Sequence, residues 1–415
     1  MDNVTHALAG MLLADVALLA VTPRDEPIDP RFRRRARWAS ALANNLPDLD
    51  GLLRNVTPGR LGYLLHHRGH SHTFGVTLVL GALCFCVLRA LWRKPTGAPA
   101  GRERWTLFAL CLVGGWVHVA MDFSNNYGVH PFWPLYDGWL YGDAVFIIEP
   151  LFWVLTIPAL ALASQHRATK LLLFGIVAIG VVLAWVTEFA NRGTALFLTL
   201  LTVVFVGLNL QLAQRTRTLV AFGGALATAG VFLVASRVAR TAVVEAAHFS
   251  APKGAAPIDL ADMSLAPAPS NPFCWSAMAV GQRGDRYGLW VATVTLAPGL
   301  VPKDGCRVEP TGRTLALQVA SLESTPIVRW DGEWTAPLDA LGALARTNCE
   351  ASAYLRWARL PFWVQRGREL VLGDLRYDRS PELDFAEIVG TSPPSTCPKR
   401  VPPWIPPRAA LIDPR

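Results

Sequence analysis

The chain has 415 residues, of which 52% are hydrophobic and only 17% are charged. Soluble proteins average roughly 25% charged residues, so the composition excludes a disordered chain and, with a mean hydropathy of +0.30, indicates that much of the chain is embedded in a membrane. The net charge of +8 does not indicate a nucleic-acid partner, because the arginines lie in short loops between apolar runs, where they are better explained as a topology signal.

Membrane-spanning helices are the first elements that the sequence predicts, because an apolar run of about 20 residues crosses the hydrocarbon core of a bilayer. Two runs near the start are weaker candidates: residues 4–21, which contain His6 and Asp15 and lack the basic flank of a signal peptide, and the short run 38–53. Six stronger candidates follow at residues 73–92, 105–122, 144–163, 169–187, 194–212 and 218–236. The expected fold class is an all-α polytopic membrane bundle of about eight spans, followed by a smaller mainly-β extracytoplasmic domain.

The side of the membrane follows from the Lys and Arg residues of the loops, which accumulate on the cytoplasmic side. Fifteen lie in the loops 22–37, 89–104, 164–170 and 213–218, and only four lie in the alternate loops 54–71, 123–143 and 188–193. This alternation places the N-terminus and everything after residue 237 on the outer side, provided that residues 38–53 cross the membrane. If they are re-entrant, only the orientation of the first helix changes.

The C-terminal part of the sequence differs from the first part in composition and pattern. From Ala251 onward, Pro-rich loops alternate with short β-like runs such as residues 290–296 and 369–372. We expect a membrane-embedded domain over residues 1–163, additional transmembrane helices over residues 164–240, and an extracytoplasmic, mostly β domain over residues 251–415 that ends in an extended surface tail.

Cysteines divide at the same place. Cys84, Cys86 and Cys111 lie in predicted spans and are interpreted as small apolar residues. Four more lie in the C-terminal part, where widely scattered spacing favours two disulfides over a metal site: Cys274, Cys306, Cys349 and Cys397. The spacing does not determine the pairing.

Histidines and acids gather near the outer boundary of the predicted bundle. Six of the nine histidines lie in the first 120 residues. One ionisable residue at a helix end is commonly only a cap, but a convergent set indicates a shared site. On the predicted topology this set consists of His6, Asp48, Asp50, His67, His72, His118, Asp122, Asp137 and Asp143. His130, His166 and His248 are instead expected at the surface or an interface.

The set suits a divalent metal ion. His118 and Asp122 are four residues apart, which places an imidazole and a carboxylate on one helical face. Imidazole and carboxylate ligands together suit zinc or another borderline divalent ion, and several carboxylates suit a site of two or three ions.

These motifs resemble the YdjM family over about residues 1–160. The resemblance is carried by His6, Asn45-Leu46-Pro47-Asp48-Leu49-Asp50, His67-Arg68-Gly69-His70-Ser71-His72-Thr73, His118 with Asp122, and then Gly128, Pro134 and Asp143. The chain departs from the family in having Ser71 and Thr73 where Thr and Ser are more frequent, which keeps both hydroxyls. Glu149 stands where an acid, often Asp, is usual.

The resemblance implies a metal-dependent hydrolase of the inner (plasma) membrane, distantly similar to zinc-dependent phospholipase C and P1 nuclease. By that kinship, one to three divalent ions, zinc before others, would be held by His6, Asp48, His67, His72, His118 and Asp122. Asp50 and Asp143 would be additional ligands or lie behind the ligands, and Asp50 would orient the metal-activated water and take its proton. Arg68 would stabilise charge on phosphoryl oxygens.

Three functions follow as hypotheses. The first is hydrolysis of a phosphoester, rather than an amide, in a lipid or lipid-linked substrate that enters laterally from the outer leaflet. The second is non-enzymatic binding or transport of a divalent metal, which the intramembrane acids Asp15 and Glu188 motivate. The third makes the outer β domain the functional module, binding a cell-envelope polymer. The substrate and the oligomeric state are left open by the sequence.

Overall fold

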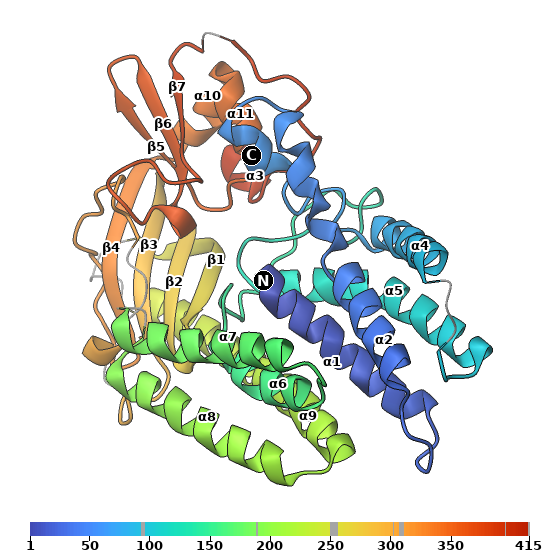
Figure 1. Cartoon of the computed structure of the whole chain (residues 1–415). Helices are drawn as coiled ribbons and strands as arrows, with labels where there is room; N and C mark the ends of the chain where they lie inside the picture. Colours follow the sequence, from blue (N-terminus) through green and yellow to red (C-terminus); the bar gives the residue numbers. More distant parts are fainter. Residues whose placement is uncertain are drawn as a thin grey trace.

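The computed structural model of the protein describes residues 1–92, 96–187, 190–249, 256–301, 303–306, 311–394 and 396–413. Helices form the first part of the chain and two antiparallel sheets form most of the rest (Figure 1). Figure 1 shows α1, α2, α4 and α5 on one side of the molecule and α6 to α9 on the other.

The first helical group begins with α1 (Asn3–Val21) and α2 (Pro30–Ala43). The 3₁₀ helix η1 (Leu46–Asn55) and the short α3 (Arg60–His66) lead to α4 (Phe74–Leu91) and α5 (Ala100–Phe123). Local chemistry fixes where several helices start. The Asp2 carboxylate accepts a hydrogen bond from Thr5 N at the start of α1, and the Thr73 hydroxyl accepts one from Val76 N at the start of α4.

The second helical group consists of α6 (Pro150–Leu162), α7 (Arg167–Val186), α8 (Arg192–Gln211) and α9 (Gln214–Phe249). In the described part of the chain, six helices are long and apolar enough to cross a membrane: α1, α4, α5, α7, α8 and α9. The expected count of eight is therefore not confirmed. At 13 residues α6 is only about 20 Å long, less than the ~30 Å of a hydrocarbon core.

Residues 38–53 do not form one helix, so a span with these bounds is not confirmed. Asp29 caps α2 and Pro30 occupies its first turn, so the helix begins eight residues earlier than expected, inside the basic segment. It ends at Ala43, and Pro47 lies in the 3₁₀ helix that follows. Helix α2 nevertheless packs against α1 and brings the chain back to the end where α1 began.

One buried ion pair joins these two helices. Asp15 of α1 accepts hydrogen bonds from Arg37 Nε at 2.9 Å and from Arg37 Nη2 at 2.5 Å. Asp15 thus faces the bundle and has a partner there, as expected for an acid in an apolar helix.

The C-terminal part is sheet-rich, as predicted. A four-stranded meander runs β1 (Ile258–Ala268), β2 (Asn271–Arg283), β3 (Arg286–Thr295) and β4 (Val328–Pro337), and a three-stranded sheet runs β5 (Pro361–Arg366), β6 (Glu369–Asp374) and β7 (Ile388–Thr391). The short helices α10 (Ala340–Thr347), α11 (Cys349–Tyr354) and α12 (Ala409–Ile412), with η2 (Lys303–Gly305) and η3 (Leu375–Tyr377), complete it. Gly284 and Gly367, both with positive φ, form the tight turns before β3 and β6.

The four C-terminal cysteines form two disulfides, Cys274–Cys306 and Cys349–Cys397, as predicted. The expected surface tail is instead partly buried. Its residue Trp404 has no exposed area and donates its Nε1 hydrogen to the Leu65 carbonyl oxygen at 2.7 Å. The tail therefore packs against the last turn of α3.

Candidate metal centre

The predicted site residues come from four places in the chain that meet at one end of the first helical group. His6 lies in the second turn of α1, and His118 and Asp122 lie in the last turns of α5. Asp48 and Asp50 lie in η1. The segment between α3 and α4 adds His67, Arg68 and His72.

Four of these residues form the core of the centre. Asp48, His72, His118 and Asp122 each offer one ligand atom, and the four atoms lie within 4.8 Å of one another. The two Nε2 atoms of His72 and His118 are 3.0 Å apart, and Asp122 Oδ2 lies 3.1 Å from the first and 3.3 Å from the second. Asp48 Oδ1 lies 3.6 Å from both nitrogens.

These separations suit a metal ion. Four ligands placed about 2.0–2.1 Å from a tetrahedral zinc ion lie about 3.3–3.4 Å from one another, which falls within the observed range. His72, His118 and Asp122 are fully buried, whereas the side chain of Asp48 is 20% exposed. The ligand atoms are thus held away from bulk water, with one carboxylate reaching the surface.

The hydrogen bonds on the far side of each ring indicate which nitrogen is available. His118 Nδ1 lies 2.7 Å from the Asn44 carbonyl oxygen, which only accepts, so this nitrogen carries the hydrogen. His72 Nδ1 lies 3.0 Å from Asp50 Oδ2 and carries a hydrogen for the same reason. In the neutral rings both Nε2 atoms then present lone pairs, as metal-binding histidines do.

Without a cation this arrangement is electrostatically unfavourable, because two lone pairs and two carboxylate oxygens converge on one point. The pKa of His72 also indicates that the surrounding carboxylates stabilise a positive charge at this point. Burial alone lowers it, but hydrogen bonds to Asp122, Asp48 and Asp50 raise it to about 10. The donor set therefore fits a divalent ion, which supplies this charge in the middle of the four atoms.

Asp50 supports the ligands from behind. Its Oδ1 lies 3.2 Å from His67 Nδ1, and its Oδ2 accepts the Arg68 backbone N–H at 2.6 Å besides contacting His72. Burial raises the pKa of Asp50, but the hydrogen bonds from His67 and His72 outweigh this and hold it below its ordinary range. Both oxygens of this buried carboxylate are therefore engaged in fixing neighbouring groups.

A second group of possible ligands shares Asp48 with the first. Asp48, Asp50 and His67 offer atoms that again lie within 4.8 Å of one another. The side chain of His67 is 18% exposed, so this second group lies towards the open edge of the centre. Two overlapping groups with one carboxylate in common suit more than one ion.

His6 and Arg68 surround the core. The His6 ring stacks on that of His118 with centroids 3.8 Å apart, and its Nε2 lies 3.1 Å from Asp122 Oδ1. The amino group of Met1 contacts this same oxygen. Arg68 Nε lies 2.9 Å from Asp122 Oδ2, and Arg68 Nη1 donates to Asn125 Oδ1 at 2.7 Å. Arg68 is thus buried beside a candidate ligand rather than exposed to a substrate.

Asp143 is not brought into this cluster. Its carboxylate pairs with both terminal nitrogens of Arg359, at 2.7 and 2.8 Å, and with Arg240 Nη2 at 2.7 Å. Arg359 also binds Asp262 of β1. Asp143 therefore links the segment after α5 to α9 and to the sheet-rich part. Of the acids that suggested a transport path, Asp15 is paired with Arg37, and Glu188 lies outside the described residues.

Sequence reasoning missed the residues that support the segment between α3 and α4. Trp404 stacks on His130 with ring centroids 4.0 Å apart, and it lies 4.7 Å from the His70 ring. A methyl group on Gly69 would lie only 3.1 Å from Trp404 Cζ2, so the indole covers the backbone there. His130 is buried at this interface. The one available signal was an isolated Trp within a Pro-rich tail, and its partners are too distant in sequence to be inferred.

A bundle of apolar helices with a buried His/Asp cluster at the helix ends defines a multi-pass membrane protein with a candidate divalent-metal centre. Residues 1–192 match the model of the YdjM inner membrane protein family. This confirms the predicted resemblance and, together with the six apolar helices, supports a multi-pass protein of the inner membrane. Comparison with curated proteins and with solved structures finds no match, so the distant similarity to phospholipase C and P1 nuclease stays a prediction.

Proposed function

We propose that the protein is a membrane-bound, metal-dependent hydrolase that cleaves a phosphoester of a lipid or lipid-linked substrate. One observation carries the proposal: the two Nε2 atoms of His72 and His118, with the far side of each ring already hydrogen-bonded, converge with Asp48 and Asp122 at the spacing of metal ligands. Zinc is the ion that this mixture of imidazole and carboxylate suits best.

A divalent ion held by these residues would supply a Lewis acid that activates water and polarises a phosphoryl group. The protein's own residues hold and orient the site. His72, His118, Asp48 and Asp122 bind the ion, while Asp50 fixes the rings of His67 and His72. Because both Asp50 oxygens are engaged by neighbouring groups, we assign Asp50 a positioning role rather than the proton transfer expected from the sequence, and the proposal uses only the first group of ligands.

Arg68 has a related role. Its ion pair with Asp122 and its hydrogen bond to Asn125 hold the segment between α3 and α4 against the end of α5. The predicted contact of Arg68 with phosphoryl oxygens would require it to share its guanidinium between Asp122 and the substrate. The Arg68 side chain is only 3% exposed, so in this proposal Arg68 positions the segment rather than contacting the phosphoryl oxygens.

The open edge of the centre supports a lipid substrate. Asp48 and His67 are the partly exposed members of the cluster. Beside them, η1 exposes the apolar side chains of Leu49, Leu52 and Leu53, with 79% exposure at Leu52. An apolar surface next to a polar site suits a molecule with a hydrocarbon tail and a phosphate head group.

We also propose that the centre lies on the outer side of the membrane. The helix ends farthest from the centre join the loops rich in Lys and Arg, which are cytoplasmic by the positive-inside rule. The two disulfides support an outer location for the C-terminal part, because disulfides persist in oxidising compartments.

The test is metal analysis of the full-length protein purified in detergent, together with hydrolysis assays on bis(p-nitrophenyl) phosphate and on phospholipid micelles. We expect stoichiometric divalent metal and hydrolysis that chelation abolishes. The double variant His72→Ala, Asp122→Ala should lose the bound metal and the hydrolysis. The control variant His166→Ala, which changes an exposed histidine before α7, should keep both the metal and the hydrolysis. Full activity in the double variant would refute the proposal.

A further inference from the structure

A cavity lies far along the chain from the metal ligands, where α6, α8 and α9 meet the sheet-rich part. Its volume is about 790 Å³. The walls are apolar and include Leu155 of α6, Phe197 and Leu201 of α8, and Val231 and Phe232 of α9. Most of its lining residues lie beyond the segment that matches the inner-membrane family.

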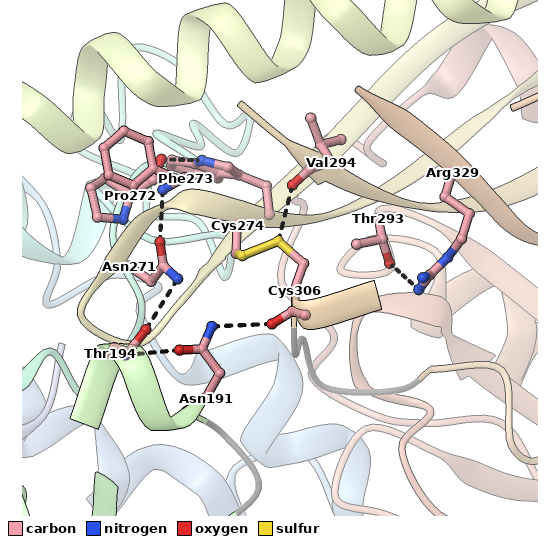
Figure 2. The surroundings of a disulfide bond; sticks show 12 residues. Asn191, Thr194, Asn271, Pro272, Phe273, Cys274, Thr293, Val294, Cys306 and Arg329 are labelled. Atoms are coloured by element: carbon pink, nitrogen blue, oxygen red, sulfur yellow. Dashed lines mark hydrogen bonds between the residues drawn. A yellow bond between two sulfur atoms is a disulfide. The ribbon is translucent and has the colours of Figure 1, made fainter. Parts of the chain in front are cut away.

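One end of the cavity is polar, and Figure 2 shows how it is built. Asn191 caps α8, accepting a hydrogen bond from Thr194 N at 2.8 Å and donating one to the Gly305 carbonyl oxygen at 3.1 Å. Asn271 donates to Thr194 Oγ1 at 3.2 Å. The Cys274–Cys306 disulfide lies directly behind and joins the two segments that carry Asn271 and Gly305.

The lining determines what kind of molecule fits. None of the described residues that line the cavity carries a charge, so a phosphate or an ammonium group would have no partner inside. Each asparagine amide nitrogen has two hydrogens, and one is used in the bonds above. The remaining hydrogen of each suits a neutral acceptor such as an ester carbonyl.

The surroundings determine where the molecule comes from. Both α8 and α9 are candidate membrane spans. The side chains that flank the cavity on these helices are half exposed, at 52% for Phe197 and 53% for Val231. In a bilayer these surfaces contact acyl chains, so the cavity is continuous with the lipid-facing surface of the bundle.

We propose that this cavity binds one alkyl chain of a membrane lipid, with the ester linkage of that lipid at the Asn191–Asn271 end. The cavity volume lies within the range of about 300–1,000 Å³ that is usual for small-molecule sites. The charged head group stays outside, beyond the polar end. This lipid site is separate from the metal centre and does not depend on metal binding.

The experiment uses the full chain in bilayer nanodiscs that contain a phosphatidylcholine with a diazirine group near the end of one acyl chain. After illumination, labelled peptides are identified and quantified by mass spectrometry. We expect labelling to concentrate on the cavity-lining residues of α8 and α9.

Two neighbouring glycines give a matched pair of variants. A Cβ on Gly224 lies in ordinary contact with Leu155 and faces the cavity, whereas a Cβ on Gly223 meets nothing within 4 Å. Gly224→Phe should block the cavity sterically and abolish the concentrated labelling. Gly223→Phe, which adds the same ring on an exposed face, should leave it unchanged. A monodisperse elution in size-exclusion chromatography and an unchanged thermal midpoint serve as the check that both variants are folded.

Equal labelling of the cavity peptides in Gly224→Phe and in the wild type would overturn the proposal, as would uniform labelling of all lipid-facing helices in the wild type. If Gly224→Phe does not fold, Thr228→Leu fills the same cavity one turn further along α9, and its labelling decides in the same way.

Discussion

Replacing Trp404 by alanine tests whether the C-terminal tail holds the metal-binding segment in place. The indole is fully buried, donates to the Leu65 carbonyl oxygen, and covers Gly69 between the candidate ligands His67 and His72. Removing a buried Trp side chain costs about 3–5 kcal/mol. Because 1.4 kcal/mol corresponds to a factor of ten and the segment relaxes partly, we expect zinc affinity to fall by about 10- to 100-fold.

The assay is competitive zinc titration against a chromogenic chelator, with the full-length protein in detergent. The matched control is Trp290→Ala, since Trp290 is also fully buried and also donates a hydrogen bond, at 3.1 Å to Glu333 Oε2, but lies in β3. Both variants should lose thermal stability, and only Trp404→Ala should lose zinc affinity. Unchanged zinc affinity in Trp404→Ala would refute the reasoning.

Three further predictions concern buried polar groups. Asp50→Asn should weaken zinc binding about 10- to 100-fold, because it disturbs the hydrogen bond that orients His72; chelator competition measures this, and an unchanged affinity would contradict it. Arg359→Ala should lower the free energy of unfolding by about 3–5 kcal/mol, because it leaves Asp143 buried without its bidentate partner; a loss below about 1 kcal/mol, as for a surface pair, would argue against it. Burial raises the pKa of Glu149 from 4.5 to about 7, so between these values the folded protein binds more protons than the unfolded one and stability falls as pH rises. Glu149→Gln should flatten this dependence in pH-resolved thermal melts.

The sequence predicted the residues of the candidate metal site better than it predicted the bounds of the helices that carry them. His118 and Asp122 were recognisable because four-residue spacing on one helix is a local property. Asp48 and His72 were recognisable because ionisable residues beside apolar runs are rare. The apolar run places the start of α2 too late, because the cap at Asp29 and Pro30 determines where the helix begins.

Long-range partners could not be inferred. Asp143 had a motif position but no visible partner, because Arg359 lies 216 residues further along the chain. The disulfide pairing was open for the same reason, since four cysteines allow three connectivities. Trp404 is distinguished only as an isolated Trp in a Pro-rich tail, which does not identify its partners. In each case tertiary packing brings together residues whose separation in the sequence conveys nothing about their distance in space.

The ion pair between Asp15 and Arg37 also bears on how the chain enters the bilayer during synthesis. A lone aspartate near the middle of a helix costs about 2.5–3.5 kcal/mol on insertion, and Arg37 of α2 adds a comparable cost. Pairing the two charges removes much of both costs. We therefore expect α1 and α2 to insert together as a helical hairpin, with α1 waiting at the translocon until Arg37 has been synthesised.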